Sequence, residues 1–370
     1  MQLSYWEYKT WFSNIDHTVV GSGIVGLSTA IFLKEKYPKA KVVVLERGVL
    51  PQGASTKNAG FACFGSLSEI CSDLKAHSEK EVIGLIWQRH KGIQLLRNLL
   101  GDDRIGYQRL GGHEIFLSKN ENLFEECLQR MAEVNEWLRP VFGEPPFALT
   151  KNRFGFKEIN PQYITHQFEG QLDAGMMMKS LLDLAVKKGV HIFNSVEVLE
   201  YDDTGDDVSL KTDAFEFSTR KLIIATNGFA KQFLKEEVNP ARAQVLVTKP
   251  IRYLHIKGAF HFDEGYYYFR NIDGRILFGG GRNLDFKVET TTKLNTTEKV
   301  QNRLEALLST VILPNTPFEI EHRWSGIMGV GNQKKPIVKA LSDNVFCGIR
   351  LGGMGVAIGS TVGKELASSI

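Results

Sequence analysis

The first 50 residues of the chain place apolar side chains in three short blocks. Residues 17–20 form a brief apolar run, residues 27–33 repeat apolar positions with helical spacing, and residues 41–45 are almost continuously apolar. A continuous apolar run is typical of a strand that is buried on both faces, as in a parallel sheet. The pattern therefore predicts a strand, a helix and a second strand parallel to the first.

Beyond this unit, long helical stretches alternate with short β-rich ones. Helices are expected at residues 67–100, ended by Gly101, at 123–138, ended by Pro140, at 172–190 and at 361–368. Strands are expected at residues 113–117, 191–199, 208–210, 215–218, 221–225 and 345–347. This mixture predicts an α/β fold.

Residues 244–286 alternate apolar and polar positions and are rich in aromatic side chains. The DG dipeptide at 273–274 separates two such runs, which is typical of a β-hairpin turn. Because successive side chains of a strand point to opposite faces, Tyr266 and Tyr268 are expected on one face and Tyr267 on the other. This part of the chain predicts an antiparallel sheet.

The turn between the first strand and the first helix has the pattern GxGxxG. Its first glycine lets the chain turn sharply, its second lets a pyrophosphate approach the backbone, and its third lets the helix pack closely on the strand. Free N–H groups at the start of the helix then face the phosphates. The dinucleotide-binding residues expected here are Gly21, Ser22, Gly23, Ile24, Val25 and Gly26.

The second strand ends at Glu46, about 20 residues beyond the glycine turn. A carboxylate at this place can accept hydrogen bonds from both ribose hydroxyls, and it disfavours a 2′-phosphate. The sequence therefore favours FAD or NAD over NADP.

Residues 53–66 (GASTKNAGFACFGS) form a run of small residues where a βαβ unit would ordinarily begin its next helix. Together with the glycine turn and Glu46, this segment resembles the D-amino-acid oxidase superfamily of FAD-dependent oxidoreductases, in particular the branch of glycine oxidase, sarcosine oxidase and gamma-glutamylputrescine oxidase. The resemblance implies FAD rather than NAD. It assigns contacts with the adenosine and phosphates to Arg47, Ser55 and Thr56, and the border of the flavin ring to Lys57, Asn58, Ala59, Gly60 and Phe61.

Two later segments extend the resemblance. Residues 222–228 (LIIATNG) match a strand end that closes over the nucleotide, and residues 348–359 (GIRLGGMGVAIG) match the glycine turn before the family's last helix. Backbone N–H groups at a helix start stabilise the negative charge of a reduced flavin. The cofactor contacts implied by these segments and the strand before them are Val196, Ala225, Thr226, Gly228, Gly352, Gly353, Met354, Gly355 and Val356.

Because the two glycine turns lie near opposite ends of the chain, both ends are expected to build one cofactor domain. The expected fold is a Rossmann-type FAD-binding domain with an inserted α+β substrate domain built on an antiparallel sheet. The FAD-binding domain is expected to comprise residues 1–100, 150–235 and 320–370, and the substrate domain residues 101–149 and 236–319.

The resemblance implies an enzyme that transfers a hydride to flavin N5 from the CH–NH carbon of a small amine, secondary amine or amino acid, leaving an imine that hydrolyses. The substrate pocket is expected to include Lys57, Tyr268, Arg270 and Met328. Met328 stands where glycine oxidase-like members place an arginine for the substrate carboxylate, so an amine is favoured unless Arg270 or Lys57 replaces that arginine.

Two further family residues have no clear counterpart in this sequence. One is the lysine that helps oxygen react in sarcosine oxidases, so the electron acceptor is expected to be either oxygen or another compound. The other is the cysteine that attaches the flavin covalently in some relatives, so FAD is expected to be bound non-covalently.

Other functions of a flavoprotein remain open. The cofactor could oxidise a 2-hydroxy acid or glycerol phosphate, which requires a cationic anchor in the pocket. The chain could instead be a flavin-bearing electron-transfer subunit of a larger complex, with the aromatic residues of segment 5–12 as its contact. A tRNA-modifying flavoenzyme is disfavoured because no basic patch is visible.

Composition narrows the classes of partner. The formal net charge is only +3, and Lys and Arg are scattered, so no nucleic-acid partner is expected. The four cysteines, Cys63, Cys71, Cys127 and Cys347, form no CxxC pair, so free thiols and no metal site are expected. Neither a secretory signal nor an apolar window of membrane-spanning length is visible, so a cytoplasmic protein is expected.

Overall fold

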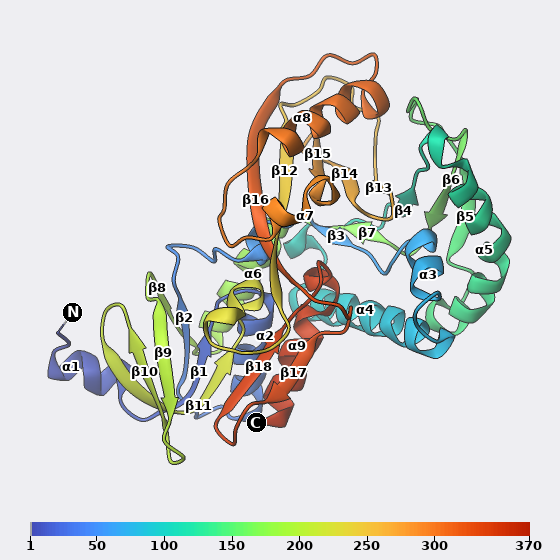
Figure 1. Cartoon of the computed structure of the whole chain (residues 1–370). Coiled ribbons are helices and arrows are strands. Elements are labelled where there is room, and N and C mark those ends of the chain that lie inside the picture. Colours follow the sequence, from blue (N-terminus) through green and yellow to red (C-terminus); the bar gives the residue numbers. More distant parts are fainter. Residues whose placement is uncertain (1) are drawn as a thin grey trace.

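The structure is a computed structural model that describes residues 2–370. Two eight-stranded sheets organise it, and Figure 1 shows them on different sides of the molecule. The strands of the first sheet are β1 (Ile15–Val20), β2 (Val42–Glu46), β8 (His191–Asn194), β9 (Val198–Asp203), β10 (Val208–Thr212), β11 (Glu216–Ile224), β17 (Ile337–Ala340) and β18 (Val345–Ile349). Their order is β17-β18-β11-β1-β2-β8, with β10 paired to β11 and β9 to β10.

The centre of the first sheet is parallel. Strand β1 pairs in parallel with β2 on one side and β11 on the other, and β8 and β18 extend the parallel part outward. All five residues of β2 are buried, which confirms the strand predicted from the continuous apolar run. Ser195 has a left-handed backbone (φ 57°) that interrupts the single strand predicted for residues 191–199, so that β8 and β9 are separate.

The α-helices are distributed around both sheets (Figure 1). They are α1 (Tyr5–Glu7), α2 (Ile24–Lys36), α3 (Leu67–Asp73), α4 (Glu79–Leu100), α5 (Glu121–Phe142), α6 (Ala174–Lys187), α7 (Phe286–Glu289), α8 (Glu298–Leu307) and α9 (Gly355–Ser369). Helix α9 lies beside α2 and α4 (Figure 1). Its Gly363 permits the close approach to α2, because a Cβ atom there would lie 2.8 Å from the carbonyl oxygen of Val25.

The second sheet is mainly antiparallel. Its strands are β4 (Gly112–Glu114), β5 (Phe147–Lys151), β6 (Gln162–His166), β12 (Asn239–Thr248), β13 (Ala259–Phe262), β14 (Tyr267–Ile272), β15 (Arg275–Gly280) and β16 (Ile320–Val330), in the order β16-β12-β15-β14-β13-β4-β6-β5. A separate two-stranded sheet pairs β3 (Phe61–Ala62) with β7 (Gly170–Gln171). The combination confirms the predicted Rossmann-type and antiparallel architecture.

The predicted hairpin is present, with its side chains on the expected faces. Asp273 and Gly274 both have positive φ angles (48° and 71°), as a two-residue hairpin turn of type I′ requires. Tyr267 and Phe269 belong to a buried aromatic core on one face of the sheet, whereas Tyr268 packs on the opposite face against Ala59 and its neighbours.

The stretch 67–100 holds two helices, α3 and α4, and two helix boundaries lie four residues or more from the predicted ones. Pro140 does not end α5, which continues to Phe142, because a proline in the last turn removes only one helical hydrogen bond. The helix ends instead at Gly143, which is left-handed (φ 85°). The final helix, predicted to begin at Thr361, begins at Gly355.

The division of the chain into two domains stays a prediction. Strands β6 and β16 belong to the second sheet although their residues are expected in the FAD-binding domain, and β5 spans the expected boundary at residue 150.

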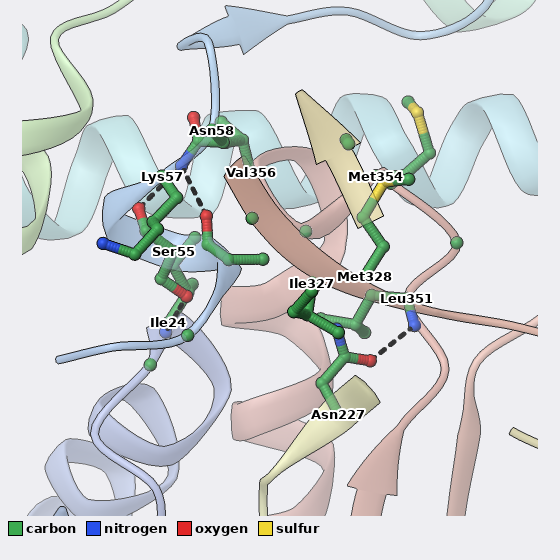
Figure 2. A pocket seen from close by; sticks show the side chains of 18 of the residues that line it. Ile24, Ser55, Lys57, Asn58, Asn227, Ile327, Met328, Leu351, Met354 and Val356 are labelled. Carbon is green, nitrogen blue, oxygen red and sulfur yellow. Dashed lines mark hydrogen bonds between the residues drawn. The ribbon is translucent and has the colours of Figure 1, made fainter. Parts of the chain in front are cut away.

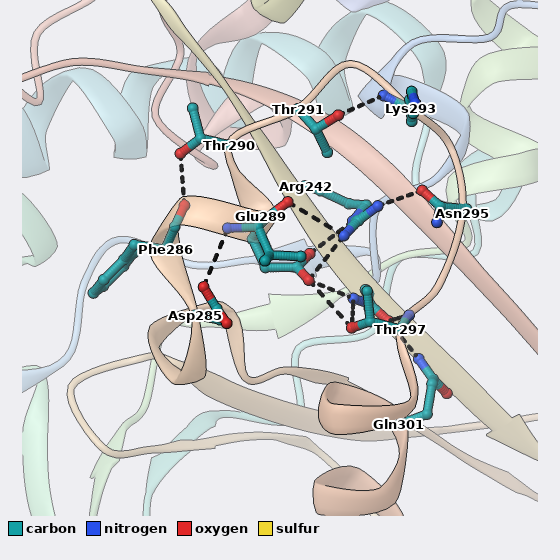
Figure 3. Close-up of polar contacts among 12 residues, drawn as sticks. Arg242, Asp285, Phe286, Glu289, Thr290, Thr291, Lys293, Asn295, Thr297 and Gln301 are labelled. Carbon is teal, nitrogen blue, oxygen red and sulfur yellow. Dashed lines mark hydrogen bonds and ion pairs between the residues drawn. The ribbon is translucent and has the colours of Figure 1, made fainter.

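A buried ion pair fixes the loop before α8 onto the second sheet. Arg242 of β12 donates two hydrogen bonds to the carboxylate of Glu289, at 2.7 and 2.9 Å, and a third to Asn295 (Figure 3). The Glu289 carboxylate also accepts hydrogen bonds from Gln244 and Thr297. Burial alone would raise the pKa of Glu289, but the hydrogen bonds from Arg242 and Gln244 outweigh it and lower that pKa.

Most aromatic residues of the N-terminal segment do not pack on the protein. Tyr5 and Trp6 are 66% and 69% exposed, and only Phe12 of segment 5–12 is buried. Among residues 2–370, no helix is both long enough and apolar enough to cross a membrane.

Candidate functional site

A cavity of about 610 Å³ lies where the two sheets, the glycine turns and segment 53–73 meet. Figure 2 shows Ser55, Lys57 and Asn58 on one side of it and Met328, Leu351 and Met354 on the other. These residues come from opposite ends of the chain, so the fold brings the two predicted glycine-rich segments to one site.

The first glycine turn forms one end of the cavity. Gly21 has a positive φ of 103°, and a Cβ atom on Gly26 would lie 1.9 Å from the carbonyl oxygen of Gly21. Only glycine at position 26 therefore allows α2 to begin so close to the turn. The N–H of Ile24, at the start of α2, donates to Ser55 Oγ at 3.0 Å, which brings the small-residue segment beside the helix N-terminus.

Glu46 lies at the carboxyl end of β2 with its side chain fixed by protein donors. Its Oε2 accepts hydrogen bonds from the N–H and hydroxyl of Ser22, at 3.2 and 2.8 Å, and its Oε1 accepts one from the N–H of Gly48 at 3.0 Å. These bonds hold a carboxylate at the cavity wall, where a ribose is expected.

The residues at this end fit a dinucleotide. Helix α2 points free N–H groups and the positive end of its dipole at the cavity. The Thr226 hydroxyl oxygen, which lines the same cavity, is buried without a hydrogen-bond partner among residues 2–370. A bound polar group at this place would satisfy that hydroxyl, whose burial without a partner is otherwise costly.

The second glycine turn approaches the cavity from the C-terminal side. Arg350, Gly352 and Gly353 have positive φ angles of 61°, 58° and 83°, and α9 begins directly after them. The Leu351 N–H donates to Asn227 Oδ1 at 3.2 Å, which ties this turn to the end of β11 (Figure 2). The N-terminus of α9 therefore faces the middle of the cavity.

Most of the predicted site residues line this single cavity. Those that do are Gly21, Gly23, Ile24, Val25, Glu46, Arg47, Ser55, Lys57, Asn58, Ala59, Phe61, Val196, Ala225, Thr226, Tyr268, Met328, Gly352, Gly353, Met354, Gly355 and Val356. Those that do not are Ser22, Gly26, Thr56, Gly60, Gly228 and Arg270. The assignment of individual contacts to FAD or substrate stays a prediction.

The residues that do not line the cavity support its wall. Ser22 binds Glu46, and the Thr56 hydroxyl donates to the carbonyl of Pro51 at 2.6 Å. Arg270 was expected in the substrate pocket, but its guanidinium is buried and donates to the carbonyl oxygens of Ala59, Gly60 and Leu172. All three bonds come from Nη1 and hold the side chain against the main chain, so a role for Arg270 as a substrate anchor stays a prediction.

Several cavity residues were missed in the sequence. At one end, the Phe229 ring lies beneath the guanidinium of Arg47, with 3.9 Å between the ring centroid and Cζ. The apolar residues that follow the ATNG motif were the sequence signal that could have identified it. At the other end the cavity is lined by Cys63, Glu69, Asp73, Glu169, His261, Glu264, Tyr266, Arg282 and Lys334. These come from five separate segments with no common motif.

The middle of the cavity is aromatic and apolar. Phe61 and Tyr268 meet edge to face at 5.6 Å between ring centroids, and Met328 and Met354 line the same cavity. Burial raises the pKa of the Tyr268 hydroxyl to about 12, so this group stays protonated at neutral pH. The arrangement offers a desolvated space next to a neutral hydroxyl.

Fold and site together define a flavin-dependent oxidoreductase. A model of the family described as FAD dependent oxidoreductase, DAO, matches residues 16–369, and the chain belongs to this family. The probable oxidoreductase OrdL of Haemophilus influenzae is 22% identical over 380 residues, covering 98% of this chain and 84% of that protein.

Solved structures have the same fold at low sequence identity. Glycine oxidase from Geobacillus kaustophilus superposes with a TM-score of 0.76 at 17% identity, covering 96% of this chain and 95% of that chain. L-proline dehydrogenase from P. horikoshii gives a TM-score of 0.75 at 16% identity, covering 96% and 92%. The FAD dependence that the family implies agrees with the nucleotide end of the cavity.

Glu46 offers a direct test of the nucleotide end. Replacing it with glutamine is expected to weaken FAD binding at least about tenfold, because an amide NH₂ would face the Ser22 or Gly48 donors and a charge-assisted acceptor would be lost. The measurement is FAD titration of apoprotein by quenching of flavin fluorescence. A dissociation constant equal to that of the unchanged protein would show that Glu46 does not contribute to the ribose site.

Proposed function

We propose that the protein oxidises the CH–NH bond of a small amine, secondary amine or amino acid with non-covalently bound FAD. When bound, FAD supplies a two-electron acceptor for the hydride that leaves the carbon next to nitrogen. The imine product would leave the cavity and hydrolyse in water. The electrons would then pass to oxygen or to another acceptor.

The observation that carries the proposal is the apolar middle of the cavity next to the N-terminus of α9. Phe61, Tyr268 and Met328 would exclude water and hold the amine in its neutral form, which helps hydride leave. The N–H groups at the start of α9 would stabilise negative charge that develops on the reduced cofactor. Met328 cannot bind a carboxylate, and Arg270 donates to main-chain carbonyls, which favours an amine. Lys57, which lines the cavity, is the cation that could hold the carboxylate of an amino acid instead.

The first test is the visible spectrum of the purified protein after addition of FAD. We expect the visible absorption bands of an oxidised flavin to appear and to bleach on anaerobic addition of an amine. The rate at which the bands return in air distinguishes an oxidase from a dehydrogenase. Bleaching by hydroxy acids alone would contradict the proposal.

Non-covalent attachment has its own test. Acid precipitation of the FAD-loaded protein is expected to release the yellow colour into the supernatant, because no bond joins the cofactor to the chain. Colour that stays with the washed pellet would show a covalent flavin and contradict this part of the proposal.

The exposed N-terminal aromatics favour one second candidate, a flavin-bearing subunit that passes electrons to a partner protein. Tyr5 and Trp6 are exposed at an end of the molecule, as contact residues of a partner would be. Steady turnover of an amine by the isolated chain with oxygen or a small dye would argue against this candidate.

A further inference from the structure

The cavity extends beyond its apolar middle toward a wall that carries carboxylates. Residues 61–73 run along this wall, from Phe61 beside Tyr268 to Asp73 at the end of α3. Four acidic side chains from three segments line it, namely Glu69, Asp73, Glu169 and Glu264.

Glu169 is the deepest of these side chains, with 1% of its surface exposed. Its Oε1 accepts hydrogen bonds from the N–H groups of Phe64 and Gly65, at 2.6 and 3.1 Å. Its Oε2 lies against Gly112 and has no hydrogen-bond partner among residues 2–370. A buried carboxyl group thus keeps one oxygen without a protein partner at the cavity wall.

The charges around Glu169 leave it without an ion-pair partner. Burial is the largest cause that raises the pKa of Glu169, to about 8, and the carboxylate of Glu69 adds to it. Arg89 of α4 opposes this rise, but its Nη1 donates to the Phe64 carbonyl at 2.6 Å. The other titratable groups nearby are Cys63, Tyr107 and His261, and Arg109, which donates to the carbonyl of Gln167.

The cations that line this part of the cavity lie at its rim. Lys334 forms an ion pair with Asp73 at 2.6 Å. Arg282 stacks on Phe286, 5.0 Å from its ring centroid, and Phe286 is 47% exposed. No Lys or Arg of residues 2–370 lies within ion-pair distance of Glu69 or Glu169, although the buried Arg89 lies behind this wall and its charge opposes the rise in the pKa of Glu169.

We propose that Glu69 and Glu169 bind a second cationic group of the amine substrate, so that the substrate class is a diamine. This inference rests on the proposed function and names the substrate of the same site. Four residue steps separate Phe61, beside the apolar middle, from Gly65, which Glu169 binds. Because an extended chain advances about 3.3 Å per residue, the Cα atoms of Phe61 and Gly65 lie no more than about 13 Å apart, so one small molecule could reach both the apolar middle and the carboxylates.

Binding of a cation next to Glu169 requires its ionised form. Because the pKa of the free carboxyl is about 8, binding below that pH releases one proton. The reactive amine must lose its proton in every ligand, so this contribution cancels when two amines are compared. The ratio of the diamine's affinity to that of butylamine should therefore rise about tenfold per pH unit up to about pH 8 and then level off, until the second amine loses its proton near its usual pKa of about 10.

Three ligands that share one reactive end test the proposal. Butylamine, 1,4-diaminobutane and 4-aminobutanoate carry the same CH₂–NH₃⁺ group and differ only in a methyl, ammonium or carboxylate tail. Anaerobic calorimetric titration of the FAD-loaded protein, with its FAD reduced beforehand, at pH 6, 7, 8 and 9 gives each dissociation constant without turnover. We expect the diamine to bind at least about tenfold more tightly than butylamine at pH 8, with 4-aminobutanoate weakest.

Glu169→Gln removes the charge and keeps a carbonyl oxygen for the N–H groups of Phe64 and Gly65. This variant is expected to lose both the diamine preference and the pH dependence, whereas Glu69→Gln should lose part of the preference. Glu125→Gln, exposed on α5, is the matched control and should behave like the unchanged protein. If Glu169→Gln does not fold, the order of the three affinities and its pH dependence in the unchanged protein still test the proposal.

Each outcome separates this inference from the proposed function. Equal affinities for butylamine and the diamine, or tightest binding of 4-aminobutanoate, would overturn the cation site, and the latter result would point to Arg282 or Lys334. Flavin bleaching by butylamine with no diamine preference would leave the amine oxidation intact and reject the diamine. Tight, pH-dependent diamine binding without bleaching by any amine would reject the proposed oxidation and retain the site.

Discussion

Replacement of Gly26 by alanine is expected to abolish FAD retention and to destabilise the protein by about 3 kcal/mol or more. The added Cβ atom would lie 1.9 Å from the carbonyl oxygen of Gly21 and 3.1 Å from its carbonyl carbon. Both are backbone atoms, so no change of side-chain rotamer can relieve the contact. The start of α2 must therefore move away from the glycine turn, and the N–H groups that face the phosphates move with it.

The measurements for Gly26→Ala are flavin content after purification with added FAD and the midpoint of urea unfolding of the apoprotein. Gly84→Ala is the matched control, because Gly84 is an exposed helical glycine of α4 with no atom within 4 Å of the added Cβ. Alanine there should raise stability by up to about 1 kcal/mol and leave FAD binding unchanged. A Gly26→Ala protein with normal flavin content would contradict the close approach described for this turn.

Truncation of Glu289 is expected to have the second large effect. Glu289→Ala leaves the guanidinium of Arg242 buried without its carboxylate, and both side chains of the pair are at most 3% exposed. Loss of one partner from a buried pair typically costs about 3 to 5 kcal/mol. The urea concentration at the unfolding midpoint should fall accordingly. The loop between α7 and α8 should also become sensitive to protease, because Thr297 loses its hydrogen bond to Glu289 and Asn295 is bonded to an Arg242 that Glu289 no longer holds.

The exposed pair between Lys249 and Glu319 provides the comparison. Its side chains are 54% and 73% exposed, so Glu319→Ala should change the midpoint little. The double variant Arg242→Met with Glu289→Met should recover much of the stability lost in Glu289→Ala, because no charge stays buried. A double variant as unstable as the single one would show that packing, and not the unpaired charge, causes the loss.

The nucleotide end of the cavity could be predicted because it depends on local rules. Glycine at positions 21 and 26, the helix after them and the acid that ends the second strand all lie within 30 residues, and each constraint acts between near neighbours. The hairpin at Asp273 and Gly274 was predictable for the same reason, since two positive φ angles restrict the residue types.

The substrate end could not be predicted, because its residues meet only through tertiary contacts. Strand alternation placed Arg270 on the same face as Tyr268, but alternation does not say how far a long side chain reaches or which carbonyls it meets. Glu169 belongs to no motif, and its burial depends on β3 and β7 pairing across more than 100 residues of chain. Pro140 was misjudged because its cost depends on its distance from a helix end that the sequence marks only by Gly143.

The order of the first sheet also determines when the cavity can be complete. Strand β11 lies between β1 and β18, and α9 follows β18 at the very end of the chain. A chain that is still emerging from the ribosome therefore holds the first glycine turn but lacks the wall opposite to it. Tight FAD binding to a complete cavity therefore requires that residues 345–369 have been synthesised.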